Sequence, residues 1–262
     1  MIHITNGDMV ARKIQLIFPN DVVVPWREIN TEGPICLDPR DLSEREYRSH
    51  WLASELGIPS DEYLINHRKQ LALLDDVSDT EELCLWFEYD LFDQSILWEI
   101  CVVLIDKFEA SWFDQGHLSL VTLDSFDGIN EFHGLGQLDT HQLKSLFPKR
   151  IQMNREMTLN GADWWERFAL GNVEITERIS PNELPFARAA FQFHILRKPD
   201  EQGLGIVERT ILQVVLEGNH SWDSCFHETS RRLLQYGMGD LQFKAILKRM
   251  KNMGYTIDLI DK

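Results

Sequence analysis

Apolar and polar positions alternate in blocks along the first 150 residues. Short apolar runs at 2–5 and 22–24 predict strands, and the amphipathic stretch at 9–18 predicts a helix between them, with Asp8 as its N-cap. This strand–helix–strand order is typical of a right-handed unit with two parallel strands. Because residues 22–24 are all β-branched, we expect this strand to be buried on both faces.

The same order continues along the chain. Strands are predicted at 83–87 and 118–123, and helices at 41–56, 60–74, 91–105 and 140–147. The helix at 91–105 is apolar nearly all round, so we expect other elements to cover it on more than one side. Alternating strands and helices predict an α/β fold for residues 1–150, with a mainly parallel sheet and flanking helices.

The remainder of the chain predicts helices. Residues 151–202 are interpreted as a helical connector, with helices at 162–170 and 182–196. In residues 203–262 three helices, at 206–216, 222–234 and 240–253, precede a strand at 255–260. This order resembles a winged-helix module, whose third helix can enter a groove of DNA.

Charge separates this last unit from the rest. The chain carries 26 Lys and Arg against 42 Asp and Glu, a formal charge of −16. Residues 203–262 account for about +1 of this and the first 202 residues for about −17. An acidic body repels nucleic acid and anionic membranes. The basic residues of the third helix are the candidates for contact with DNA, and a solvated helix face is the alternative: Lys244, Lys248, Arg249 and Lys251.

The sequence favours a reduced, cytoplasmic protein. No apolar run approaches the ~20 residues that span a bilayer, and the N-terminus does not resemble a signal peptide. The 4 cysteines form no C-x-x-C pair, so a cysteine-based zinc site has no support. Cys84 and Cys101 lie in apolar runs and are interpreted as core residues.

Several segments carry a resemblance to a bacterial family known as domain of unknown function 1835. They are His3–Asp8, Pro25–Arg27 with Gly33–Pro34, Leu85–Gln94, Gly134–Gly136 and Gly237–Phe243. The resemblance covers most of the chain and implies an α/β domain followed by a helical C-terminal module. Its members often carry His where Tyr89 stands here, which argues against a catalytic imidazole at that position. The family has no established activity, so the resemblance implies no reaction.

Acidic residues follow three of the predicted strands. Asp8 follows the first, Glu88 and Asp90 follow the strand at 83–87, and Asp124 follows the strand at 118–123. Ligands of parallel α/β sheets bind outside the carboxyl ends of the strands, where these side chains would meet. Asp8, Glu88 and Asp90 are therefore the candidate metal ligands or general acid–base residues, and Mg²⁺ is the cation that such carboxylates suit.

Further residues at the same edge could hold a ligand. Asn6 and Gly7 place main-chain amides at a helix start, Arg27 supplies a positive charge, and Asp93 and Gln94 lie in the first turn of the helix at 91–105. No dinucleotide-binding or P-loop motif occurs. The ligand class that fits is a small molecule with a phosphate group, held through a cation or a helix start.

Two alternatives to this site remain open. The acidic residues Asp8 and Asp90 would serve equally well as helix N-caps, each worth ~0.5–2 kcal/mol. The protein could also be a regulatory or scaffold protein whose C-terminal module binds DNA or another protein.

The sequence does not decide whether the chain is an enzyme. His3 is interpreted as a neutral core histidine, and His133 and His141 as surface residues.

Overall fold

The computed structural model describes residues 1–174, 182–255, 257 and 259, and its centre is a five-stranded sheet. The strand order is β2-β1-β3-β4-β5. The strands span Ile2–Asn6 (β1), Val22–Trp26 (β2), Leu83–Trp86 (β3), Leu118–Val121 (β4) and Ile151–Gln152 (β5). The first four are parallel and β5 is antiparallel to β4. The predicted α/β fold with a mainly parallel sheet is confirmed, although the predicted helical connector contributes β5.

Side chains alternate across the strands, so the two faces of the sheet bury different residues. Ile4 and Leu85 pack with α3 (Ser60–Asp76) and α4 (Leu91–Lys107) on one face. Cys84 and Trp86 pack with α1 (Gly7–Ile17) and α6 (Thr140–Leu146) on the other face. The remaining elements of this part are α2 (Leu42–Leu56), α5 (Ala110–Asp114), η1 (Leu135–Gln137) and η2 (Phe147–Lys149).

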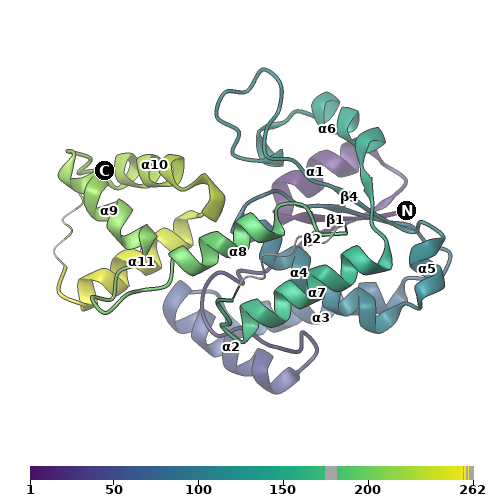
Figure 1. Cartoon of the computed structure of the whole chain (residues 1–262), viewed down its shortest axis with the longest axis horizontal. Helices are drawn as coiled ribbons and strands as arrows, with labels where there is room; N and C mark the ends of the chain where they lie inside the picture. The colour runs from purple at the N-terminus through teal and green to yellow at the C-terminus, as the bar shows by residue number, and fades with distance from the viewer. Residues whose placement is uncertain (175–181, 256, 258, 260–262) are drawn as a thin grey trace.

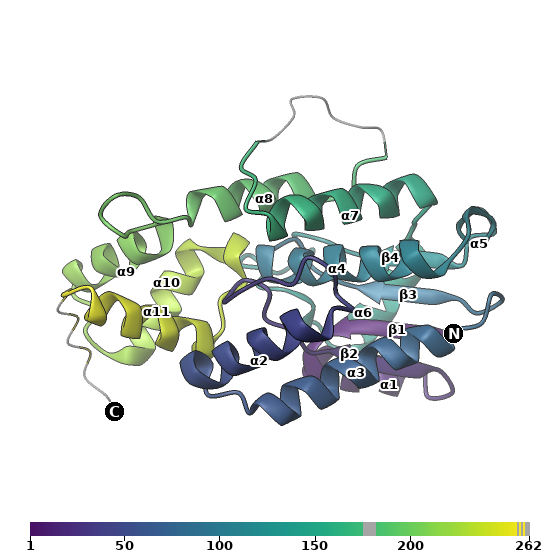
Figure 2. The ribbon, with the colours of Figure 1, turned by 90° about the horizontal axis from the view of Figure 1, so that it is seen from below.

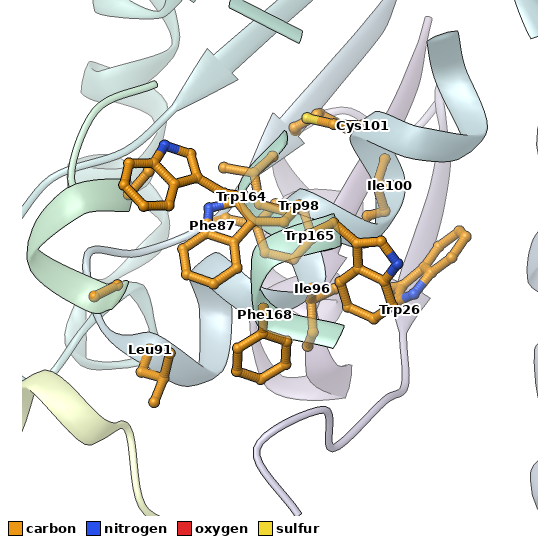
Figure 3. Close-up of a cluster of buried hydrophobic side chains, with 14 of the residues drawn as sticks. Trp26, Phe87, Leu91, Ile96, Trp98, Ile100, Cys101, Trp164, Trp165 and Phe168 are labelled. Atoms are coloured by element: carbon orange, nitrogen blue, oxygen red, sulfur yellow. The ribbon is translucent and has the colours of Figure 1, made fainter. Parts of the chain in front are cut away.

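Helix α4 lies between the sheet and a further layer of helices, as its all-round apolar sequence predicts (Figure 2). That layer consists of α7 (Arg155–Ala169) and α8 (Ala187–Leu196). Trp98 of α4 stacks with Trp164 of α7 in the aromatic cluster of Figure 3. Gly161 lets α7 approach closely, because a Cβ atom there would lie 2.5 Å from Sγ of Cys101. The core therefore extends beyond the first 150 residues.

The C-terminal part is helical and lies beyond the carboxyl edge of the sheet, toward which the strand arrows point (Figure 2). It contains α9 (Ile206–Leu216), α10 (Trp222–Arg232), η3 (Leu234–Tyr236) and α11 (Asp240–Asn252). The three predicted helices are confirmed. Among the described residues no winged helix is seen, because no strand accompanies these helices. Residues 256, 258 and 260 of the predicted strand at 255–260 lie outside the described residues.

Three further predictions need correction. Val22 is 49% exposed because β2 is an edge strand, so the run at 22–24 is not buried on both faces. Helix α1 begins at Gly7, with Asn6 at the N-cap position, which places Asp8 inside the first turn. Helix α8 begins at Ala187 instead of residue 182, after Phe186 in a left-handed conformation (φ 64°).

Two other predictions concern caps and membrane spans. The expected end of α2 is confirmed by Gly57, whose φ of 72° is the left-handed conformation that glycine adopts without strain. Among the described residues no helix is both long enough and apolar enough to cross a bilayer.

Candidate functional site

The strand order creates a crevice between β1 and β3. The chain leaves β1 toward β2 on one side, and it returns to β3 on the other side of β1. Doubly wound sheets bind ligands at this change of direction, outside the carboxyl ends of the strands. A cavity of about 310 Å³ lies there, and we call it the acidic cavity. Asn6 from the end of β1 and three carboxyl groups that follow β3 line it: Glu88, Asp90 and Asp93.

These three carboxyl groups are buried and share local hydrogen bonds. The exposed fractions of Glu88, Asp90 and Asp93 are 8%, 4% and 1%. Asp90 is the N-cap of α4 and accepts a bond from the Asp93 amide at 2.9 Å. Asp93 accepts one from the Glu88 amide at 2.7 Å. The capping alternative is thus confirmed for Asp90, and the same side chain also lines the cavity.

Burial and mutual repulsion raise the pKa values of these three carboxyl groups. Burial, followed by the charges of Asp93 and Asp90, raises the pKa of Glu88 well above its usual range. Burial raises the pKa of Asp90 to about 7, and burial with the Asp90 charge raises the pKa of Asp93. Among the described residues no lysine or arginine lines the cavity. The cluster is therefore short of positive charge.

Two glycines bring main chain directly against the carboxyl groups. Gly134, at φ 132°, lies so close to Glu88 that a Cβ atom would fall 1.7 Å from Oε2. The Leu135 amide next to it donates to Oε1 of Glu88. Gly237, at φ 65°, approaches Asp90 in the same way from the C-terminal part, with a Cβ position 2.4 Å from Oδ1. Neither contact was foreseen, although Gly134 and Gly237 are in segments that carry the family resemblance.

The side chain of Asn6 does not cap α1. It holds the N-cap position of α1 but caps no amide with its side chain, which instead donates to Asp93. The first-turn amides of α1 consequently have no side-chain cap at a point that borders the cavity. An uncapped helix start carries partial positive charge and favours an anion.

Asp8 and Arg27 form a separate pair. Arg27 donates to the two Asp8 oxygens at 2.6 and 3.1 Å, and the bond lowers the pKa of Asp8. Neither residue lines the acidic cavity, so the structure does not bring Asp8 together with Glu88 and Asp90 as the sequence predicts. Asp124 is exposed and lies outside it as well. The reason is local. Asp8 is the second residue of α1, and its side chain pairs with Arg27, which directly follows β2.

Arg27 instead borders a second, more apolar cavity of about 270 Å³. Asn6 and Phe92 line both cavities, so the two are neighbours across the start of α1. Gly7 lines only the second. Gln94 lines neither and is fully buried, where its amide nitrogen donates to the Glu88 carbonyl at 2.6 Å. Gln94 therefore positions the site without facing it.

The sequence did not reveal the C-terminal wall of the acidic cavity. It is formed by residues of α10, η3 and the following turn: Ser230, Leu233, Leu234, Gly237 and Met238. His133 is exposed, as predicted, yet it also lines the cavity. These residues are far from β3 in the chain, and no local pattern marks them as its neighbours.

A second group of buried acids is neutralised within the protein. Glu28, His67 and Glu99 lie close enough to hold a metal ion. However, Arg45 donates to both carboxylates, and Arg48 donates to Glu28 at 2.7 Å. Two buried guanidinium groups already balance two buried carboxylates, which leaves no net negative charge to attract a cation. This cluster is an ion-pair network that joins α2, α4 and the segment after β2.

The basic residues of α11 are mostly occupied. Lys248 pairs with Glu55 of α2 at 2.9 Å, and Arg249 pairs with Glu32 at 2.8 Å. Lys244 lies 3.8 Å from Asp240 of its own helix. Only Lys251 has no ion pair among the described residues. The helix that was a candidate for the DNA groove instead packs against α2, as Figure 1 shows.

His3 is confirmed as a buried, hydrogen-bonded residue of the core. Its Nδ1 accepts a bond from Trp86 at 3.1 Å, and burial lowers its pKa. His141 is exposed.

No family model and no curated protein matches this chain, so the family resemblance stays a prediction.

Proposed function

We propose that the protein binds a phosphate-bearing small molecule together with a divalent cation in the acidic cavity. The observation that carries the proposal is the cavity itself: three buried carboxyl groups line it, and no basic side chain of the described residues balances them. The Glu28–Glu99 network shows the opposite arrangement, in which arginines compensate every carboxylate.

A cation would change the protonation of the cluster. Without it, burial and mutual repulsion raise the pKa values of Glu88 and Asp93 and so favour their protonated forms. A divalent cation prefers carboxylate oxygens and would displace these protons. Glu88, Asp90 and Asp93 would supply the oxygen ligands of the cation.

The phosphate group finds its support at the start of α1. The amides there have no side-chain cap, and Asn6 separates them from the carboxyl groups. A cation between the cluster and the phosphate would balance both sets of charges. The raised pKa of Asp90, about 7, also suits a general acid or base at neutral pH, so the same site could support phosphate-ester chemistry.

The test uses Mg²⁺ alone and then Mg²⁺ with inorganic phosphate or AMP. After dialysis against a chelator, we expect MgCl₂ to raise the Tm of the full chain, because a ligand that binds only the folded state stabilises it. Phosphate or AMP should bind in calorimetry only when Mg²⁺ is present. Adenosine, which lacks the phosphate, should not bind.

Matched variants assign the effect to the cavity. Asp90→Asn keeps the N-cap of α4 but removes a charge, and should weaken Mg²⁺ binding at least about tenfold. Asp124→Asn removes an exposed carboxylate after β4 and should change nothing. Absence of a Mg²⁺ effect on the wild type, or an equal loss in both variants, would overturn the proposal.

A regulatory role through DNA has weaker support. It rests on the basic stripe of α11, and the ion pairs to Glu55 and Glu32 occupy its central members. Contact of the C-terminal part with the cavity favours a different role for it: Gly237 touches Asp90, and Tyr236 donates to Glu32. The C-terminal helices thus complete the site.

A further inference from the structure

The second cavity, of about 270 Å³, lies beside the acidic cavity across the start of α1. Asn6 and Phe92 line both cavities, and Gly7, the first residue of α1, lines the second. A Cβ atom at Gly7 would meet no atom within 4 Å, so the space over this residue is open. A single ligand could therefore extend from one cavity into the other over the start of α1.

The surface of the second cavity is largely apolar. Buried side chains of β2, α2 and α3 contribute to it: Trp26, Leu52 and Tyr63. Ile29, Ile58 and Phe92 also line it and are only half-buried, so a ligand can reach them. This surface suits an apolar group, because water is released when such a group covers it.

The charged groups that line this cavity are compensated within the protein. Two buried arginines of α2 bind Glu28. Arg27 pairs with Asp8, and this bond, together with the charges of Asp8 and Glu62, raises the pKa of Arg27. The described lining therefore has no spare positive charge to hold a phosphate. The part of a ligand that fits here is uncharged.

Two polar side chains of α3 border the apolar surface. Glu62 is exposed and Asn66, one helical turn later, is half-buried. Neither side chain forms a hydrogen bond within the described chain. An amide offers donors and an acceptor, and a carboxylate offers acceptors. An aliphatic ligand would leave these groups without partners, whereas a nucleobase combines apolar faces with donors and acceptors along its edge.

We propose that the second cavity holds the base of a nucleoside monophosphate whose phosphate lies at the start of α1. This inference rests on the proposed function and names the substrate class of the same site. The base would lie against Ile58 and Phe92, with its edge toward Asn66, and the ribose would lie over Gly7. Each part of the ligand would then meet a surface that suits its charge.

The experiment compares AMP with ribose 5-phosphate, which carries the same sugar and phosphate without the base. Both are titrated into the full chain by calorimetry in the presence of MgCl₂. We expect both to bind, with a Kd for AMP at least about tenfold lower. A tenfold difference is about 1.4 kcal/mol, which is too little to hold adenosine without its phosphate. In saturation-transfer NMR spectra, the adenine protons of AMP should receive more saturation from the protein than the ribose protons.

Two variants of α3 assign the difference to this cavity. Asn66→Leu keeps the size of the side chain but removes its hydrogen bonds, and it should weaken AMP binding about fivefold. Its Kd for ribose 5-phosphate should equal that of the wild type, which also shows that the variant is folded. Lys69→Leu changes an exposed residue of the same helix outside the lining and should alter neither Kd. Ile58→Phe narrows the cavity and should likewise weaken the binding of AMP alone.

The outcomes separate this inference from the proposed function. If the wild type binds AMP and ribose 5-phosphate with equal Kd values, the inference is overturned and the proposed function stands. If neither ligand binds, both are overturned. Equal effects of Asn66→Leu and Lys69→Leu on AMP binding would also overturn the inference.

Discussion

Asp90 serves two purposes with one carboxyl group. It caps α4 through the Asp93 amide, and it lines the acidic cavity beside Glu88. A cap needs only an acceptor, which a protonated or amidated side chain still offers. The charge of Asp90 is therefore free to respond to pH and to a cation without loss of the helix start.

This leads to a prediction about pH. The pKa of Asp90 is about 7 in the folded chain against 3.8 for an unperturbed group, so the folded state binds this proton more tightly. Its stabilising contribution is complete below pH about 4 and is lost as the pH rises through about 7. We expect the free energy of unfolding of the wild type to fall between about pH 4 and 7. Asp90→Asn should make that fall shallower.

Urea unfolding at a series of pH values measures this effect. Part of the slope should persist in Asp90→Asn, because the pKa values of Glu88 and Asp93 are also raised. Asp124→Asn is the control and should retain the wild-type slope. A slope that is equal in Asp90→Asn and the wild type would show that Asp90 does not titrate in this range.

A second prediction concerns Gly134. Gly134→Ala places a Cβ atom 1.7 Å from Glu88 Oε2 at a φ of 132°, whereas Gly128→Ala, at φ 86°, meets no atom within 4 Å. A positive φ strains the backbone of alanine at both positions, by about 1–3 kcal/mol each. We expect Gly134→Ala to lose at least ~1 kcal/mol more than Gly128→Ala in denaturant unfolding, and to weaken Mg²⁺ binding. Equal losses of unfolding free energy would show that the loop at Gly134 can move away from Glu88 without cost.

At the scale of elements, buried charge joins segments that hydrophobic packing alone does not fix. Arg45 and Arg48 of α2 are fully buried and bind Glu28, which follows β2, and Arg45 also binds Glu99 of α4. Tyr63 of α3 donates to Glu28 at 2.8 Å. The network thereby sets the position of α2 and α3 relative to the sheet. Helix α11 in turn packs on α2.

Removing one member of this network should be costly. We predict that Arg45→Met lowers the free energy of unfolding by about 3–5 kcal/mol, because Glu28 and Glu99 are left buried without full compensation. Arg40→Met is the matched control: its pair with Asp75 is partly exposed, so the loss should be at most ~1 kcal/mol. Chemical denaturation measures both. Similar losses would show that the buried pairs contribute no more than a surface pair.

At the scale of the whole molecule, the acidic charge of the chain and the packing of α11 both disfavour DNA binding. The chain has a formal charge of −16, and Lys248 and Arg249 are paired with carboxylates of the α/β part. We predict that the full chain does not bind duplex DNA in a gel-shift titration at low salt. Salt-dependent binding that is lost in Lys244→Gln/Lys251→Gln would contradict this and restore the regulatory alternative.

The sequence by itself determined the local structure. Runs of apolar residues at periods of two and 3.6, with Asp41, Asp90 and Gly57 at helix ends, fix strands and helices through contacts within a few residues. They also placed Glu88, Asp90 and Asp93 after β3, and these three do share one cavity. Such features depend on near neighbours in the chain, so the pattern of residues is sufficient to predict them.

Tertiary structure decided which side chains meet across the chain. Asp8 turned to Arg27 and left the cluster, while Gly134 and Gly237 came against Glu88 and Asp90 from distant segments. The same holds for α11. Its basic residues are indistinguishable from a solvated face in the sequence, and only the fold brings Glu55 and Glu32 of the α/β part into ion pairs with them. These contacts depend on strand order and on how helices dock, and neither leaves a periodic mark in the sequence.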